Sequence, residues 1–341
     1  MIKVGTIGLG KMGLSHYAII KAHPDVDAVA VCDASGFVLS GLEKQTGVKT
    51  FKDYKRMIDD CDLDGVIIAT PTKTHAEMAQ YALEMGVNVF CEKPFTLTLE
   101  DGNKLVKLAE EYGLVNQVGF HNRYIGTFLE ARRLVKSGAI GKVYHAMAEA
   151  YGPVVIKPQE GAGATWRSEK GQGGGCLHDY ASHIIDLSHF VLNDYPERVG
   201  GTELKSIFST GVEDSVYSTA FFKDGKTTQI SVNWSDETYR KMTNRLTILG
   251  TGGKIVVDRQ EIRAYIKDDK GFEKLPQGWS IRYITELQKP VWFYLRGEEY
   301  SSQMDYFVQQ IKEKSVDNIN SFANALQTDT VIDKLAADGN H

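Results

Sequence analysis

The sequence predicts a two-domain α/β protein, and its length and hydrophobic pattern support this. Its 341 residues exceed the usual length of a single domain. In the first third, short apolar runs alternate with amphipathic stretches, which is typical of a parallel sheet covered by helices. After about residue 121, strand-like runs follow one another between turn signals, which is typical of an antiparallel sheet. We therefore expect a first domain over 1–121 and a second over 122–341.

The first domain is expected to alternate strands with helices from its first residues. The strand-like runs, several of them rich in Val and Ile and bounded by turn residues, cover 2–8, 27–33, 64–70, 88–92 and 115–120. The amphipathic stretches between them lie around 11–22, 35–45, 73–85 and 99–112. In the last stretch Leu105, Leu108 and Tyr112 recur at helical spacing, which favours a helix there.

The second domain is expected to open with a helix over 124–137 and a strand over 142–151. A glycine-rich loop over 160–175 then leads into a helix, and alternating strand-like runs fill about 197–267. Two helical patterns, near 299–314 and 320–336, close the chain. The whole is expected to form an α/β fold of two unlike halves.

Composition and charge exclude several classes of function. The net charge of −5, without a block of like charge, argues against a nucleic-acid partner. The four cysteines lie far apart with no CxxC pair, so we expect reduced thiols and not a disulfide framework or a zinc site. The start of the chain has no signal-peptide pattern, and no apolar stretch has the length of a membrane span. We expect a cytoplasmic protein without a membrane partner.

The motif GLGKMG places Gly8, Gly10 and Gly13 in G-x-G-x-x-G spacing, with Lys11 and Met12 between the last two. It follows a strand and opens a helix, where such glycines allow a tight turn and a close approach of a pyrophosphate. The helix N-terminus would face the phosphates. The alternative is a glycine turn in a doubly wound sheet that binds no nucleotide.

Asp33 ends the second strand, where a carboxylate can accept hydrogen bonds from the hydroxyl groups of the adenosine ribose. The neighbouring sequence DASG offers no basic residue for a 2′-phosphate. The predicted cofactor is therefore NAD, and NADP is disfavoured.

Two later strands also end in chemistry-bearing residues. Thr70 and Pro71 leave one strand at the carboxyl edge where ligands bind in such sheets, and His75 follows; Glu92 and Lys93 leave the next strand before Pro94. All five are candidates for contact with the cofactor. The alternatives are a turn with a helix-start histidine for the first group and a solvated loop for the second.

The stretch GGGCLHDYASHIIDL, residues 173–187, admits a metal site, an acid/base site or an ordinary polar helix. A metal site would use His178, Asp179, His183 and His189. His178 and His183 are five apart, however, whereas a zinc-type helical pair needs i and i+4, so we expect no metal. Asp179 and His183 do stand at i and i+4, on one face of the predicted helix.

Together, GLGKMGLSH, CEKPF and GGGCLHDYASH resemble the Gfo/Idh/MocA oxidoreductase family over nearly the whole chain. The resemblance implies an N-terminal Rossmann domain, a C-terminal α/β domain with a large open, mostly antiparallel sheet, and association into dimers or tetramers through the open face of that sheet. It implies that Lys93 matches the family's catalytic lysine and that Asp179 and His183 match its D-x-x-x-H pair, in which the histidine serves as acid/base. His178 and Ala181 depart from the commonest form of that motif.

The chemistry of these residue types agrees with those roles. A carboxylate near an imidazole orients it and favours its protonated form, and an imidazole titrates close to neutral pH, as an acid/base group must. A lysine ammonium can donate a hydrogen bond to a substrate oxygen and stabilise its developing negative charge.

Further residues are candidates for the substrate side. The segment GFHNRY resembles a family segment at the crossing into the second domain, with Arg123 and Tyr124 on the closest positions; bracing that crossing is an equal alternative. In TWR, the Trp166 ring suits the apolar face of a sugar, and Arg167 suits hydroxyl groups, a carboxylate or a phosphate. Tyr151, His178 and Asp179 complete the substrate candidates.

The resulting expectation is an NAD-dependent dehydrogenase that oxidises a secondary hydroxyl of a sugar, sugar derivative or cyclitol. One alternative is a glycoside hydrolase in which bound NAD oxidises the sugar transiently and elimination follows. The other is a non-catalytic protein that senses NAD or a sugar.

Overall fold

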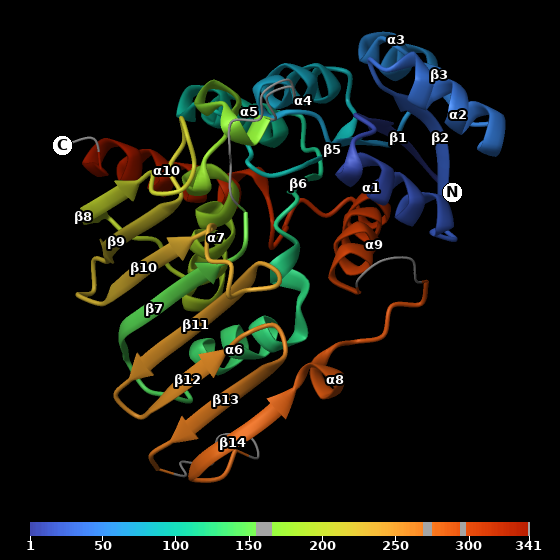
Figure 1. Cartoon of the computed structure of the whole chain (residues 1–341). Coiled ribbons are helices and arrows are strands. Elements are labelled where there is room, and N and C mark those ends of the chain that lie inside the picture. The colour runs from blue at the N-terminus through green and yellow to red at the C-terminus, as the bar shows by residue number, and fades with distance from the viewer. Residues whose placement is uncertain (155–165, 269–274, 294–297, 340–341) are drawn as a thin grey trace. The chain divides into compact units, whose positions relative to one another are not determined.

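A computed structural model describes residues 1–154, 166–268, 275–293 and 298–339. The chain forms two compact units. The first comprises Met1–His121 and Pro290–Leu326, and the second comprises Asn122–Lys289 and Gln327–His341. Each unit is described by itself, and Figure 1 labels the elements of both.

The first unit is built on a parallel sheet of strand order β3-β2-β1-β4-β5-β6. Its strands are β1 (Ile2–Ile7), β2 (Val26–Cys32), β3 (Lys49–Phe51), β4 (Gly65–Ile68), β5 (Asn88–Cys91) and β6 (Asn116–Val118). This is the order of a dinucleotide-binding Rossmann domain, in which ligands bind at the carboxyl ends of the strands where the order reverses. The predicted fold of the first domain is confirmed.

Helices cover both faces of this sheet, which is why its strands are apolar on both sides. One face packs against α3 (Tyr54–Asp60), α4 (His75–Glu84) and α5 (Leu99–Glu111). The other packs against α1 (Lys11–Ala22), α2 (Gly36–Thr46) and α9 (Glu298–Glu313).

The helix α9 departs from the predicted domain limits. We expected residues 290–326 in the second domain, but they belong to the first unit. The reason is the apolar stripe of α9, in which Met304, Phe307, Val308 and Ile311 recur at helical spacing and join the core around β1 and β5. That stripe lies far along the chain from its partner strands, so periodicity alone could not assign it.

The second unit is built on an eight-stranded sheet of order β14-β13-β12-β11-β7-β10-β9-β8. Its strands are β7 (Val143–Tyr151), β8 (Arg198–Lys205), β9 (Ser215–Phe221), β10 (Thr227–Asn233), β11 (Thr243–Gly250), β12 (Gly253–Val257), β13 (Glu261–Ile266) and β14 (Gly278–Tyr283). Neighbours pair antiparallel except β7 and β10, which pair parallel. The predicted large, mostly antiparallel sheet is confirmed.

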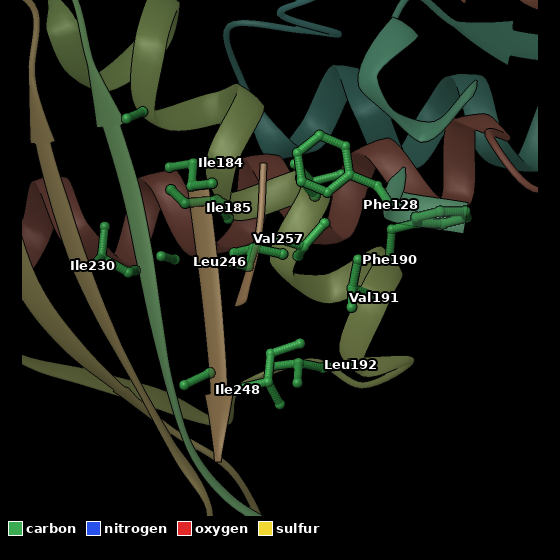
Figure 2. Packing of buried hydrophobic residues seen from close by; sticks show 14 of the residues in the cluster. Phe128, Ile184, Ile185, Phe190, Val191, Leu192, Ile230, Leu246, Ile248 and Val257 are labelled. Carbon is green, nitrogen blue, oxygen red and sulfur yellow. The ribbon is translucent and has the colours of Figure 1, made fainter. Parts of the chain in front are cut away.

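One face of this sheet carries the core. Helices α6 (Gly126–Lys136) and α7 (Ser182–Leu192) and the last part of α10 (Phe322–Gly339) contribute to it, while the short α8 (Ile284–Leu287) follows β14. Figure 2 shows Ile184 and Ile185 of α7 in the same buried cluster as Ile230 and Leu246 of the sheet. Because α7 is buried along its whole length, the polar groups at its start must find partners inside the protein.

Alternate residues on the opposite face remain more open to solvent. On β14, Trp279, Ile281 and Tyr283 are 56%, 48% and 49% exposed. They stand beside Tyr265, Arg263 and Glu261 of β13. This side of the sheet, called here the open face, is therefore partly aromatic.

Candidate functional site

The glycine turn after β1 has the geometry that the sequence predicts. Gly8 has a φ of +86°, which favours glycine. A Cβ on Gly13 would lie 1.7 Å from the carbonyl oxygen of Gly8, so only glycine allows the helix to start this close to the strand. A Cβ on Gly10 would meet no described atom within 4 Å. The space at Gly10 is thus not needed for folding, and its open backbone suits the close approach of a dinucleotide.

Asp33 reinforces this turn. Its Oδ2 accepts the Leu9 N–H at 2.6 Å, and its Oδ1 accepts the Ser35 N–H at 2.7 Å. The carboxylate therefore ties the glycine turn to the end of β2, where a ribose hydroxyl would also meet it. Lys11, which is exposed, and Met12, which is half-buried, begin α1 beside this turn. These residues fit an NAD molecule.

The residues that follow β4 differ in their exposure to solvent. Thr70 is half-buried and Pro71 is exposed, whereas His75 is only 1% exposed. The His75 Nε2 lies 2.9 Å from the Thr70 carbonyl oxygen, and its Nδ1 lies 3.0 Å from that of Pro94. Burial lowers the pKa of His75 despite these carbonyl groups. His75 thus joins the ends of β4 and β5 inside the unit, which supports the structural alternative over contact with the cofactor.

Glu92 also lies inside the unit. It is 8% exposed, its Oε1 lies 2.5 Å from the Nε2 of His16, and its Oε2 accepts the Lys93 N–H at 3.1 Å. Burial by itself raises the pKa of Glu92, but the hydrogen bond and charge of His16 and the charges of Lys93 and His121 outweigh it and lower that pKa. Because its carboxylate already has partners, the structure favours a supporting role for Glu92 over the predicted contact with the cofactor. Lys93 itself is half-buried.

His16 is a residue that the sequence analysis missed. It lies on α1 in the buried stripe with Gly13, Tyr17 and Ile20. A histidine on a buried stripe needs a polar partner, and that position was the available signal. Through the Glu92 contact, the first helix is connected to the residue before Lys93.

In the second unit, Asp179 lies on a turn that is not an ordinary helix, and His183 lies in the first turn of the helix that follows. Leu177–Ala181 form a π-helical turn, and α7 continues from Ser182. The prediction of a regular helix here is wrong, since the π turn inserts additional backbone, a device common at functional sites. Asp179 is 3% exposed and His183 is 6% exposed.

Arg167 fixes the carboxylate of Asp179. Its Nε donates to the Asp179 Oδ2 at 2.7 Å, and the arginine side chain is 44% exposed. His178, next to Asp179, is half-buried, and burial lowers its pKa against the opposing charge of Glu213 and a hydrogen bond with the Gly174 backbone. Trp166 begins a short 3₁₀ turn with Arg167. Its side chain and Thr165 lie outside the described part of the structure.

Arg123 takes the bracing role. Its side chain is 2% exposed, and it donates to both carboxylate oxygens of Asp186 on α7, at 2.9 and 2.5 Å. Burial lowers the pKa of Arg123, but the charge and hydrogen bonds of Asp186 outweigh it and leave that pKa above its ordinary value. This buried, bidentate pair leaves Arg123 in the interior, so the structure does not support the predicted contact with substrate.

Tyr151 points away from the Asp179 turn. On β7 the alternate residues Ala146, Ala148 and Ala150 join the core that contains α7, so Tyr151 stands on the open face. There its hydroxyl lies 2.7 Å from the Ser231 Oγ, and its ring stacks on Tyr239. This placement does not support the predicted contact of Tyr151 with substrate.

Comparison with known proteins agrees with this architecture. The family described as "Oxidoreductase family, NAD-binding Rossmann fold" matches residues 2–120, and the "GFO/IDH/MocA C-terminal domain" matches residues 128–256. The chain belongs to the GFO/IDH/MocA family. It is an NAD-binding oxidoreductase.

Two curated relatives illustrate the range of this family. Myo-inositol 2-dehydrogenase from Thermotoga maritima is 25% identical over 322 residues, which cover 91% of this chain and 88% of the relative. A protein from Mediterraneibacter gnavus named 2,7-anhydro-N-acetylneuraminate hydratase is 27% identical over 267 residues, which cover 77% of this chain and 69% of the relative.

Among solved structures, levoglucosan dehydrogenase in complex with NADH and levoglucosan superposes with a TM-score of 0.84 at 23% identity. The match covers 99% of this chain and 97% of that one, and shows the shared fold. In the described part of this chain, no helix combines the length and apolar character that crossing a bilayer requires.

Proposed function

We propose that this GFO/IDH/MocA protein is an NAD-dependent dehydrogenase that oxidises a secondary hydroxyl group of a sugar, sugar derivative or cyclitol. The observation that carries the proposal is a buried pair of acid/base residues in a chain whose other unit is built for NAD: Asp179, held by Arg167, and His183 at the start of α7. Relatives named for inositol and levoglucosan support the substrate class. When bound, NAD accepts the hydride from the carbon that carries the hydroxyl.

In this proposal His183 takes the hydroxyl proton. Histidine is suited to this because it exchanges protons near neutral pH. Lys93 donates a hydrogen bond to the same substrate oxygen and stabilises the negative charge that develops there. The Asp179 carboxylate, fixed by Arg167, orients the imidazole of His183.

The pairing of Arg167 with Asp179 favours an uncharged substrate. A guanidinium that recognises a carboxylate or phosphate needs its positive charge unmatched, whereas here Asp179 neutralises it at 2.7 Å. We therefore expect neutral polyols to be better substrates than uronic acids or sugar phosphates.

The test is a screen for NADH formation, followed by absorbance, over inositols, neutral monosaccharides, anhydrosugars, uronic acids and sugar phosphates. We expect NADH in proportion to the substrate consumed, with neutral polyols preferred. Lys93→Met and His183→Ala should each lower kcat by about 100-fold or more, and NADH binding by the first unit should persist in His183→Ala. If none of these compounds yields NADH, the dehydrogenase proposal is wrong.

A second candidate is a reaction without net oxidation, such as hydration or elimination after transient oxidation of the sugar. The relative named as a hydratase favours it, because adding or removing water leaves the oxidation state of the whole substrate unchanged. Product formation at a constant NADH level would identify it. A sensor without catalysis would bind NAD and polyol and convert neither.

We also propose that the chain forms a homodimer or homotetramer through the open face. The exposed Trp279, Ile281 and Tyr283 on β14 support this, since a partly aromatic sheet face gains from being covered. Ile281→Glu should shift the sedimentation of the protein toward the monomer; an unchanged oligomer would reject this surface. The expected compartment is the cytoplasm, in keeping with the free thiols of Cys32, Cys61, Cys91 and Cys176.

A further inference from the structure

The start of the Asp179 turn is held by one residue outside the predicted motifs, Glu213. Three consecutive backbone amides, the last of them in the first residue of the turn, donate hydrogen bonds. Gly175 N–H donates to the carbonyl oxygen of Arg167 at 3.0 Å, and Cys176 N–H donates to that of Glu213 at 3.1 Å. Leu177 N–H donates to the Glu213 Oε1 at 3.0 Å. Glu213 therefore accepts two of these three bonds.

Gly175 allows both an unusual backbone conformation and a close contact with the Glu213 carboxylate. Gly175 has a φ of +102°, and a Cβ there would lie 2.1 Å from the Glu213 Oε1. The carboxylate thus packs against a bare α-carbon, which explains why the glycine run ends where the turn begins. The positive φ of Gly175 favours glycine at this position, and the same Oε1 accepts the Leu177 N–H.

The base on which Glu213 stands is rigid. Its side chain is 6% exposed and the next residue, Asp214, is fully buried. The Asp214 carboxylate accepts the N–H groups of Ile207, Phe208 and Ser209, and also bonds from Ser235 and Trp234. Glu213 is therefore attached to a segment fixed on several sides, as a positioning group must be.

Arg167 and Glu213 both hold the short segment from Gly175 to Asp179. The Arg167 carbonyl accepts the Gly175 amide while its guanidinium holds Asp179. Glu213 then fixes Leu177, the first residue of the π turn and two residues before Asp179. Without Glu213, the Leu177 amide would be an unpaired donor at a buried helix start, and the turn could relax into another register.

We propose that Glu213 is the positioning residue for the catalytic turn, setting where Asp179 and His183 lie. The catalytic reading of the turn rests on the proposed function. The contacts by which Glu213 holds the turn do not depend on that function. The structural role of Glu213 and the proposed function are therefore tested by separate measurements.

The first measurement is hydrogen–deuterium exchange of the segment 175–183 in the full-length protein. In Glu213→Ala the Leu177 amide should exchange about tenfold faster, since one buried hydrogen bond is lost. Glu213→Gln keeps an acceptor oxygen of the same length and should restore protection. Unchanged exchange in Glu213→Ala would overturn the proposal, whatever the reaction of the protein.

The second measurement is steady-state kinetics with the best substrate of the screen. Glu213→Ala should lower kcat by about 10- to 100-fold, a range typical of residues that orient catalytic groups, and leave NADH affinity unchanged. Glu213→Gln should recover most of the activity. A Gln variant as inactive as the Ala variant would overturn positioning through the acceptor.

Ile248→Val is the matched control for lost stability. Ile248 lies in the core of the same sheet and is fully buried, but it is not part of the turn. Its Tm should fall while kcat and the exchange of 175–183 stay at wild-type values; an equal loss of kcat would assign the Glu213 effect to stability alone. If exchange changes as expected but the wild type reduces no NAD with any substrate, the proposed function fails and the structural role of Glu213 stands.

Discussion

Two glycine turns, one in each unit, both begin at a glycine with a positive φ but are constrained by residues at different distances along the chain. The turn after β1 starts at Gly8, with a φ of +86°, and its Gly13 is confined by the carbonyl oxygen of Gly8 itself. The turn before α7 starts at Gly175, with a φ of +102°, and is confined by Glu213, which lies in the loop just before β9. The first constraint lies within one motif, whereas the second depends on the assembled fold.

The charged residues that support the two turns also differ in how far along the chain they lie. In the first unit, the glycine turn is supported by Asp33, just after the adjacent strand β2, whose carboxylate accepts the Leu9 N–H. In the second, α7 depends on Arg123 and its turn on Arg167 and Glu213, all outside the helix. The activity of a site that is held by residues far away in the sequence should be sensitive to substitutions outside its sequence motifs.

The largest expected effect is at Arg123. Arg123→Met leaves the carboxylate of Asp186 buried without its ion-pair partner, which should cost about 3–5 kcal/mol of unfolding free energy. Urea denaturation measures this. The double variant Arg123→Met/Asp186→Leu should regain most of the loss, because a well-packed apolar pair replaces a buried ion pair at little cost. A single variant as stable as the wild type would remove the contrast between the two units.

Gly13→Ala tests the local side of the comparison. Its Cβ would lie 1.7 Å from the carbonyl oxygen of Gly8, which belongs to the backbone of the same turn. We therefore expect the free energy of unfolding to fall by about 3 kcal/mol and NAD binding to be lost. Gly10→Ala is the matched control, with no described atom within 4 Å of its Cβ. It should keep the wild-type Tm and lose NADH affinity, measured by fluorescence titration. Equal Tm values for both variants would contradict the assigned roles.

Asp214 should give the second unit a pH dependence of stability. Burial by itself raises the pKa of Asp214, but hydrogen bonds from Ser209, Phe208 and Ser235 outweigh it and lower that pKa from 3.8 to about 2. The unfolded chain therefore binds this proton first as the pH falls. Above about pH 4 the ionised carboxylate contributes about 2 kcal/mol to the free energy of unfolding, and this contribution is lost as the pH falls toward about 2.

Asp214→Asn should abolish that acid-sensitive component and lower stability at neutral pH by a similar amount. Urea titrations at a series of pH values measure both effects. A variant whose stability falls between pH 4 and pH 2 as steeply as that of the wild type would show that other carboxylates are responsible.

The smallest expected effect is at Tyr151. Tyr151→Phe removes the hydrogen bond with Ser231 on the open face, which should cost less than about 1 kcal/mol. Because the residue points away from α7, kcat/KM should stay within about twofold of the wild type, as expected for a change remote from the chemistry. A large fall in kcat/KM would show that the open face takes part in the reaction.

Periodicity and motif spacing were sufficient for the parts of the protein whose causes are local. The parallel sheet, the glycine turn and the position of Asp33 all follow from short stretches read in order. The same reasoning placed residues 290–326 in the wrong unit, because the apolar stripe of α9 does not say which sheet it covers.

The tertiary structure decided the matters that depend on residues far apart in the chain. The sequence by itself determined the two-part α/β fold, the NAD turn, and Lys93, Asp179 and His183 as candidates. Only the fold turned Tyr151 away from α7, paired Arg123 with Asp186 and Glu92 with His16, and made the helix start a π turn against Glu213. The physical reason is that buried polar groups must find partners, and which partner is in reach depends on how the elements pack.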